Sequence, residues 1–184
     1  MYPMNEEIEV LKVVCQGLEK GGIAYMITGS IASSFYTVPR MTRDIDIVVE
    51  IKQENTESLV EIFQKDFYVD VEAVRAAIRM RGMFNIIHNQ RVVKVDFIVR
   101  KDDPYRRLEF DRRRQVKMDE TSVWIVSPED LILSKLFWAR DTLSEMQLTD
   151  VRNLLRTAKG LDKNYLEKWA HTLNLKAVYE RVAP

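Results

Sequence analysis

Two aspartates stand two positions apart in a mainly apolar stretch of the sequence. They are Asp44 and Asp46 in DIDIVVEI. On a β-strand, residues i and i+2 point to the same face, so both carboxylates would project side by side. Two carboxylates at this distance raise each other's pKa unless a cation lies between them. For a lone pair of this kind, a solvated edge strand is the simplest interpretation.

Two further features favour a metal site. Gly29-Ser30 follows a short apolar segment, and glycine at a helix N-terminus lets backbone N–H groups approach a phosphate. Asp96 is the only acid in the apolar stretch VVKVDFIV, and a neighbouring strand could bring it beside the first pair. Three carboxylates can bind two metal ions for nucleotidyl transfer. Oxygen ligands of this kind suit Mg²⁺, or Mn²⁺ in its place.

The surrounding pattern predicts a mixed α+β fold in which helices flank a mixed sheet. We expect a sheet-containing core over 1–126 and a helical C-terminal region over 127–184, packed on the core. In the core, strands are expected at 23–28, 41–51, 83–88, 92–99 and 123–126, and helices at 6–20, 30–36, 53–67, 71–80 and 104–116. In the C-terminal region, Ser127-Pro128-Glu129-Asp130 predicts a helix start, and helices are expected at 131–140, 144–158, 163–172 and 175–182.

Composition restricts the class of protein. The 184 residues are 46% hydrophobic and 30% charged with a net charge of zero, which is typical of a globular protein and shows no global attraction to nucleic acid or membrane. A single cysteine cannot form an internal disulfide. No stretch reaches the roughly 18 apolar residues of a transmembrane helix. We therefore expect a cytoplasmic protein without a membrane partner.

The segment ITGSIASSFYTVPRMTRDIDIVV resembles the signature of the DNA polymerase β-type nucleotidyltransferase superfamily. That signature is Gly followed by Gly or Ser, a gap, and then D-x-D. Thirteen residues separate Ser30 from Asp44, a gap at the long end, and Asp96 matches the third acid on a later strand. The resemblance implies an NTP substrate, with Gly29 and Ser30 at its phosphates, and Mg²⁺ held by the three acids.

A second stretch is more specific. SPEDLILSKLFWARD followed by QLTDVRNLL resembles the C-terminal half of AbiEii-like nucleotidyltransferases, the toxins of a type IV toxin–antitoxin system. This resemblance implies that Lys135 contacts the triphosphate and that Asp150 belongs to the site. A threonine precedes Asp150 where that family usually has an arginine, and the chain is shorter than the larger toxins, so an acceptor-binding domain would be absent.

Several residues have simpler interpretations. Lys135 could be an exposed lysine on an amphipathic helix, and Asp150 a surface acid. Arg40, in the loop before the acid pair, is a further candidate for phosphate contact or an ordinary surface charge. The basic segment from Arg100 to Lys117, with eight basic and four acidic residues, is either a solvated helix or a flank that receives a triphosphate or RNA.

The sequence therefore predicts a metal-dependent nucleotidyltransferase. It would transfer a nucleoside monophosphate from an NTP to an acceptor hydroxyl on RNA or tRNA, on a protein, or on a small molecule, with release of pyrophosphate. The alternative is a non-catalytic nucleotide-binding or regulatory module of a toxin–antitoxin pair, with a cognate antitoxin as its partner. A structural domain whose acids face water is the third possibility.

Overall fold

The computed structural model describes residues 5–39, 42, 44–142 and 144–183. The chain begins with α1 (Asn5–Lys20), β1 (Ala24–Ile27), α2 (Gly29–Tyr36) and β2 (Asp44–Glu50). A 3₁₀ turn (Gln53–Asn55), α3 (Thr56–Phe63), β3 (Phe67–Val69), α4 (Val71–Met80), β4 (Met83–His88) and β5 (Lys94–Val99) follow. The sheet is completed by β6 (Arg114–Met118) and β7 (Thr121–Ile125), which come after α5 (Pro104–Asp111). The last helices are α6 (Pro128–Thr142), α7 (Glu145–Thr157), α8 (Lys163–Thr172) and α9 (Lys176–Glu180).

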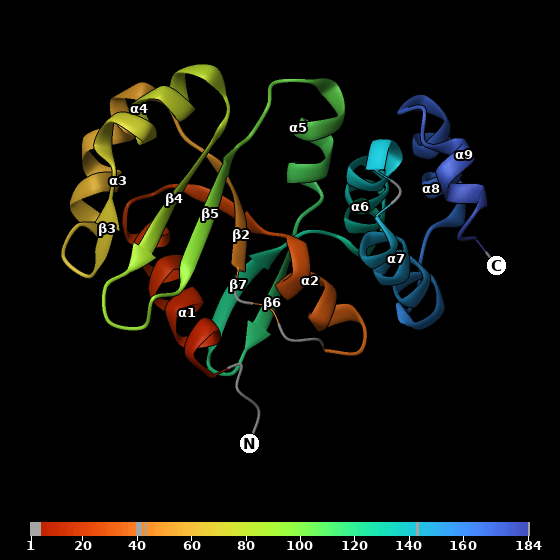
Figure 1. Ribbon diagram of the computed structural model, residues 1–184, viewed down its shortest axis with the longest axis horizontal. Coiled ribbons are helices and arrows are strands. Elements are labelled where there is room, and N and C mark those ends of the chain that lie inside the picture. The colour runs from red at the N-terminus through yellow and green to blue at the C-terminus, as the bar shows by residue number, and fades with distance from the viewer. Residues whose placement is uncertain (1–4, 40–41, 43, 143, 184) are drawn as a thin grey trace.

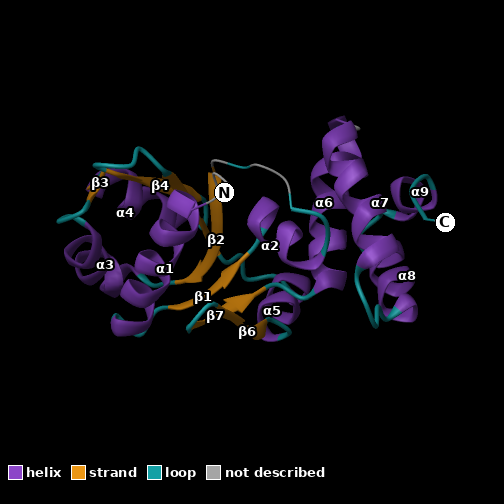
Figure 2. Cartoon of the chain, turned by 90° about the horizontal axis from the view of Figure 1, so that it is seen from below, coloured by secondary structure: helices purple, strands orange, loops and turns teal. Residues whose placement is uncertain are grey.

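The sheet has seven strands in the order β3-β4-β5-β2-β1-β7-β6. Only β5–β2 and β1–β7 pair in parallel, and the other neighbours are antiparallel. The predicted mixed α+β fold with helices flanking a mixed sheet is therefore confirmed. Figures 1 and 2 both show α6 to α9 gathered at one end of the molecule, away from β3, α3 and α4.

Two edge strands overlap the C-terminal ends of segments that the sequence predicted as helix. The helix expected over 53–67 ends at Phe63, and Phe67–Val69 forms β3 against β4. The helix expected over 104–116 ends at Asp111, and Arg114–Met118 forms β6 against β7. In both places, hydrogen bonding to a strand that comes later in the sequence overrides the local helical pattern.

One hydrophobic cluster joins the sheet to the C-terminal helices. Its fully buried members include Ile45 and Phe97 from the sheet, Leu136 from α6 and Leu154 from α7. The proposed boundary between residues 126 and 127 falls in the turn between β7 and α6. None of the described helices is both long enough and apolar enough to cross a membrane.

The predicted start of α6 has the expected capping residues. The backbone N–H of Asp130 donates to Oγ of Ser127 over 3.2 Å, and Pro128 occupies the first helical position. The carboxylate of Asp130 is fully buried and accepts hydrogen bonds from Ser127 Oγ at 2.6 Å, Tyr165 Oη at 2.6 Å and Arg112 Nε at 2.9 Å. This acid therefore ties α6 to α8 and to the end of α5.

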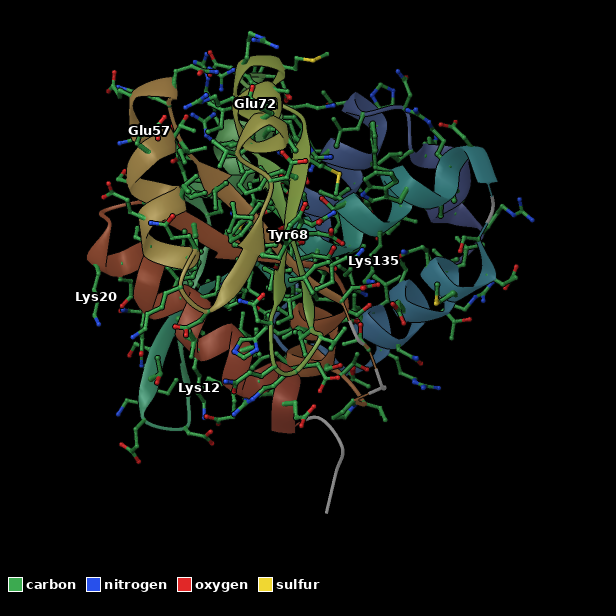
Figure 3. The ribbon with its side chains drawn as sticks, turned by 60° about the vertical axis from the view of Figure 1, so that its left-hand side comes forward. Lys12, Lys20, Glu57, Tyr68, Glu72 and Lys135 are labelled. Atoms are coloured by element: carbon green, nitrogen blue, oxygen red, sulfur yellow. The ribbon has the colours of Figure 1, made fainter. Side chains whose placement is uncertain are left out.

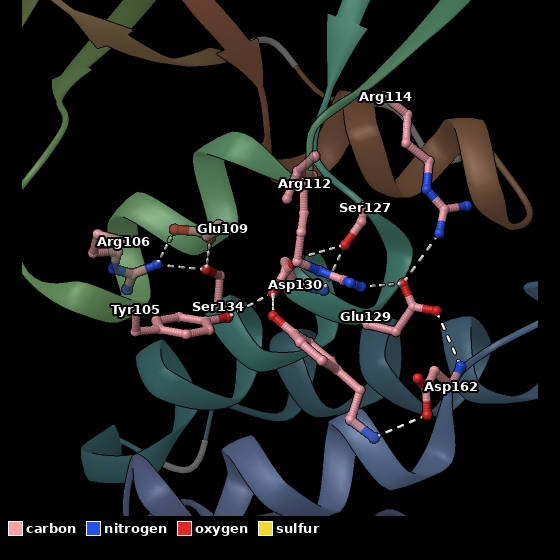
Figure 4. A network of polar contacts seen from close by, with 12 residues as sticks. Tyr105, Arg106, Glu109, Arg112, Arg114, Ser127, Glu129, Asp130, Ser134 and Asp162 are labelled. Carbon is pink, nitrogen blue, oxygen red and sulfur yellow. Dashed lines mark hydrogen bonds and ion pairs between the residues drawn. The ribbon is translucent and has the colours of Figure 1, made fainter.

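Two further buried glutamates extend this network (Figure 4). Glu129 forms ion pairs with Arg112 and Arg114, both at 3.5 Å, and accepts a hydrogen bond from the backbone N–H of Asp162. Glu109 accepts from Ser134 Oγ at 2.6 Å and pairs with Arg106 at 2.7 Å, while burial raises the pKa of its carboxyl. Arg106, Arg112 and Arg114 of the basic segment therefore pair with buried glutamates, so the interpretation of the segment as a simply solvated helix does not hold for these three arginines.

Replacement of Asp130 is expected to destabilise the protein strongly. Asp130→Ala removes the acceptor of four side chains, those of Tyr105, Arg112, Ser127 and Tyr165, and leaves Arg112 without its closest buried partner, so we expect a loss of about 3 kcal/mol in the free energy of unfolding. The measurement is urea unfolding followed by circular dichroism. Asp141→Ala is the matched control. Asp141 also forms an ion pair with an arginine, Arg140, but it is exposed to solvent. It should leave the free energy of unfolding almost unchanged, and equal losses for both variants would contradict a structural role of the network.

Candidate active site

The pairing of β2 with β5 brings the predicted acids together. Asp46 lies directly opposite Asp96, and Asp44 lies opposite Lys94, on parallel neighbouring strands that are about 4.8 Å apart. The alternating residues, among them Ile45, are fully buried on the other face. Asp44, Asp46 and Asp96 therefore share one face of the sheet, as the sequence predicts.

Lys94 is a site residue that the sequence analysis missed. Its Nζ lies 2.8 Å from Oδ2 of Asp96 and 3.6 Å from Oδ1 of Asp44. The hydrogen bond to Asp96 is the main reason why the pKa of Lys94 is raised, so the ammonium stays charged. The signal was present in the strand VVKVDFIV, where alternation places Lys94 on the same face as Asp96.

Asn85 extends the row of polar residues on the neighbouring strand. It is exposed on β4 and lies opposite Asp96 in the antiparallel pairing of β4 with β5. Asp46, Asp96 and Asn85 thus form one line across three strands. Only the register of the sheet reveals this neighbour.

Asp46 is the acid in the most demanding environment. Burial is the main cause that raises the pKa of its carboxyl, and the charges of Asp96 and Asp44 add to it. The positive charges of Lys135 and Lys94 act in the opposite direction but do not cancel the effect. An ionised Asp46 is therefore costly in the folded protein unless a further cation is bound.

Gly29 packs against Asp46 at the N-terminus of α2. Its φ is +65°, and a Cβ added there would lie 2.0 Å from Oδ2 of Asp46, so only glycine fits this turn. The strand and the turn are also joined by a hydrogen bond from the Thr28 N–H to the Asp46 carbonyl, 2.9 Å long. Thr28 is the N-cap of α2 and makes no side-chain capping hydrogen bond. The helix therefore begins with its backbone N–H groups directly beside the acids.

Lys135 and Asp150 form a buried ion pair between α6 and α7. The distance from Nζ to Oδ2 is 2.7 Å, and the two residues are only 4% and 6% exposed. Nζ also donates to Oε1 of Gln147 over 3.2 Å. Neither residue is the exposed surface charge that was the simpler interpretation. Lys135, labelled in Figure 3, is close enough to Asp46 to lower the pKa of that acid.

The other predicted residues are placed less completely. Ser30 is the second residue of α2, next to Gly29 and therefore near Asp46. Arg40 lies outside the described residues, so its predicted role stays a prediction.

Solved structures with similar folds were found, whereas no family model and no curated protein sequence matches the chain. An antigenic nucleotidyltransferase-like protein from Paracoccidioides brasiliensis aligns with a TM-score of 0.59 at 16% identity, over 95% of this chain and 90% of that one. The antibiotic-resistance factor ANT(2'')-Ia aligns with a TM-score of 0.60 at 13% identity, over 96% and 95%. The lincosamide antibiotic adenylyltransferase LnuA, solved with lincomycin bound, gives 0.53 at 16% identity, over 81% and 94%.

The chain has a nucleotidyltransferase fold. At sequence identities of 13–16%, structural similarity establishes the fold only. Activity and substrate must be argued from the residues of the site.

Asp44, Asp46 and Asp96 offer the type of donor atom that binds a divalent cation, and they lie on one face of neighbouring strands. Carboxylate oxygens are the ligands that Mg²⁺ prefers. However, no group of three or more His, Cys, Asp or Glu side chains within the described ranges is gathered closely enough to hold a metal ion. Lys94 engages one oxygen each of Asp44 and Asp96. The donor set is thus present, with an ammonium group in contact with two of its three members.

A cavity adjoins the Lys135–Asp150 pair in this nucleotidyltransferase fold. It has a volume of about 400 Å³, lies between α2 and α7, and is lined by Asp150 and, among others, Ser33, Thr37, Glu145 and Asn153. The hydroxyl oxygens of Ser33 and Thr37 are buried and have no hydrogen-bond partner among the described residues. A larger cavity of about 530 Å³ lies among α7, α8 and α9 and contains none of the predicted site residues.

Substitution of Gly29 should disturb the acid site. Gly29→Ala forces a Cβ into the side chain of Asp46 and strains a positive φ, so we expect a loss of about 2–3 kcal/mol in the free energy of unfolding. Gly160→Ala is the matched control, because Gly160 has a φ of +69° and an added Cβ would contact nothing. Its loss should stay near 1 kcal/mol. Equal losses in thermal unfolding would show that Asp46 does not restrict this turn.

Neutralising Asp46 should stabilise the protein in the absence of ligands. A raised pKa means that ionisation of Asp46 opposes folding, and this penalty is present above the pKa of the folded state and absent below the ordinary value of about 3.9. We expect Asp46→Asn to increase the free energy of unfolding at pH 7.5 by roughly 1 kcal/mol, or about 2–4 °C in Tm. The gain should shrink as the pH falls toward 4. A destabilised variant at pH 7.5 would contradict this account.

Proposed function

We propose that the protein transfers a nucleoside monophosphate from an NTP to an acceptor hydroxyl. The observation that carries this proposal is the juxtaposition of Asp46 with Asp96 on neighbouring strands and with Gly29 at the start of α2. Carboxylates that attract cations and a helix N-terminus that attracts phosphate meet at one point. The likeness to nucleotidyltransferase structures supports the same reaction class.

The proposed reaction is one displacement at the α-phosphorus. A bond forms between the acceptor oxygen and this phosphorus, the bond from the α-phosphorus to the bridging oxygen of the β-phosphate breaks, and pyrophosphate leaves. Asp96 is our candidate for the base that takes the proton of the acceptor hydroxyl. Bound Mg²⁺ or Mn²⁺, held by Asp44, Asp46 and Asp96, would neutralise phosphate charge. The protein contributes positioning and electrostatic stabilisation.

The triphosphate would be held by residues around α2 and α6. The backbone of Gly29 and the hydroxyl and backbone of Ser30 suit the β- and γ-phosphates. Lys135 adds a positive charge, and Asp150 holds its ammonium group in position through the 2.7 Å ion pair. Arg40 stays a proposed additional contact. This arrangement would leave the α-phosphate closest to Asp44 and Asp46.

The proposal also concerns the branch of the nucleotidyltransferase superfamily and the chemical class of the acceptor. The AbiEii-like branch, with a cognate antitoxin as a partner, rests on the sequence resemblance around Lys135 and Asp150, which form a buried ion pair. ANT(2'')-Ia was solved with adenylyl-2''-tobramycin and LnuA with lincomycin, so a small-molecule hydroxyl is an acceptor class to test beside RNA, tRNA and protein. A cytoplasmic location, where NTPs are available, completes the proposal.

Label transfer tests the proposed reaction directly. The protein is incubated with each of the four NTPs labelled at the α-phosphate, with Mg²⁺ or Mn²⁺, and with total RNA, lysate protein or a panel of hydroxyl-bearing antibiotics. We expect label on one acceptor class together with pyrophosphate release, and loss of both by at least 100-fold in Asp46→Ala. Asp66→Ala, an exposed aspartate outside the site, is the matched control and should keep full transfer.

Thermal unfolding separates binding from transfer. An NTP with Mg²⁺ at 100 times its Kd should stabilise the folded protein by about 2.7 kcal/mol, and Asp46→Ala should remove this shift. A shift without label transfer would favour the non-catalytic, nucleotide-binding module of a toxin–antitoxin pair. If neither a shift nor label appears with any NTP and either metal, the proposed function is wrong.

A further inference from the structure

Lys94 places a positive charge inside the row of acids. Its ammonium group contacts Asp96 at 2.8 Å and Asp44 at 3.6 Å, the two acids that flank it on the same face of the sheet. The backbone register fixes this arrangement, because Lys94 lies opposite Asp44 and two residues before Asp96. Its position is therefore a consequence of strand pairing and not of a flexible loop.

The ion pair between Lys94 and Asp96 differs from an ordinary surface ion pair in the solvent exposure of its acid. Lys12 provides a comparison, since it also bridges two carboxylates, those of Glu9 at 2.9 Å and Asp119 at 2.7 Å. Asp119 is 72% exposed, whereas the side chain of Asp96 is only 16% exposed. Lys94 is itself 41% exposed and Lys12 18%, so the difference lies in Asp96, where solvent screens the ion pair less than at Asp119. The ammonium of Lys94 is thus held against one acid, Asp96, that is largely shielded from solvent.

The consequence concerns the number of metal ions that the site can accept. A two-metal site built from these three acids requires their carboxylates to converge, and the described residues form no group of three or more His, Cys, Asp or Glu side chains that could hold a metal ion. Lys94 already supplies positive charge to Asp44 and to Asp96, and it would repel a divalent cation bound between these two acids. Asp46 is in contact with the phosphate-facing turn at Gly29 and keeps its carboxylate for a cation that enters with the nucleotide.

We infer that Lys94 is a built-in cation that replaces the second, acceptor-side metal ion, so that the site takes up one divalent cation together with its NTP. This inference rests on the proposed function. It makes Lys94 a positioning residue that holds Asp96 and Asp44 on the acceptor side, in place of the metal contacts that the proposed function gives to these two acids. It also separates two tasks, because the ammonium group serves the acceptor side while the single metal ion serves the phosphates.

The test is the stoichiometry of Mn²⁺ bound in the presence of a saturating NTP analogue that has a methylene group between the α- and β-phosphorus atoms. Free Mn²⁺ is measured by electron paramagnetic resonance, and analogue binding by equilibrium dialysis of the same samples. We expect one Mn²⁺ per chain for the wild type and two for Lys94→Met, which keeps the apolar part of the side chain and removes the charge. Lys94→Arg keeps the charge and should bind one.

The matched control is Lys12→Met, which removes an ammonium that bridges the carboxylates of Glu9 and Asp119 and contacts none of the three acids. It should bind one Mn²⁺. Circular dichroism of each variant verifies that it is folded, and Lys94→Gln, which also removes the charge, replaces Lys94→Met if that variant does not fold. Two Mn²⁺ in the wild type or in Lys94→Arg, or one in folded Lys94→Met, would overturn the inference alone. A wild type that binds neither analogue nor Mn²⁺ would overturn the proposed function, and the inference with it.

Discussion

The parallel pairing of β2 with β5 is the constraint on which the site depends. Side chains on a strand alternate between faces, so a shift of one residue in this register would turn Asp96 into the core. The buried partners on the opposite face, Ile45 and Phe97 among them, make such a shift costly because they would move into the polar row. The hydrophobic core thus fixes the relative positions of the acids. Packing of apolar side chains on one face of the sheet therefore positions the acids on the other face.

The electrostatic cost of the acids is distributed over several elements. Ionisation of Asp46 is unfavourable, because this acid is partly buried between two other carboxylates and a glycine turn. Lys94 compensates it from β5 and Lys135 from α6, so cations reach the acids from two separate parts of the fold. Lys135 is itself balanced by Asp150 on α7. Attachment of the C-terminal helices therefore affects both stability and the charge at the site, and the buried network around Asp130 keeps that attachment firm.

Local patterns were sufficient for some features and insufficient for others. Strand alternation predicted the shared face of Asp44 and Asp46, and capping residues predicted the start of α6. The short edge strands β3 and β6 were not predicted, and the predicted helices 53–67 and 104–116 extended into them, because a three- or five-residue strand is stabilised by its partner and has little periodicity of its own. The contact of Lys94 with Asp44 depends on non-local pairing, as does the burial of Lys135 against Asp150. Family resemblance identified Lys135 and Asp150, while their ion pair became visible only in the structure.

The row of acids has two different sides, and an in-line transfer needs both. On one side lie β1, the turn at Gly29 and α2, where backbone N–H groups and Lys135 provide positive charge. On the other side lies β4 with the exposed Asn85, a neutral residue opposite Asp96. A triphosphate is attracted to the first side and gains nothing from the second. Under the proposed function, the nucleotide therefore occupies the α2 side and the acceptor approaches over β4 and β5, so Asp96 and Lys94 are the charged groups that the acceptor meets.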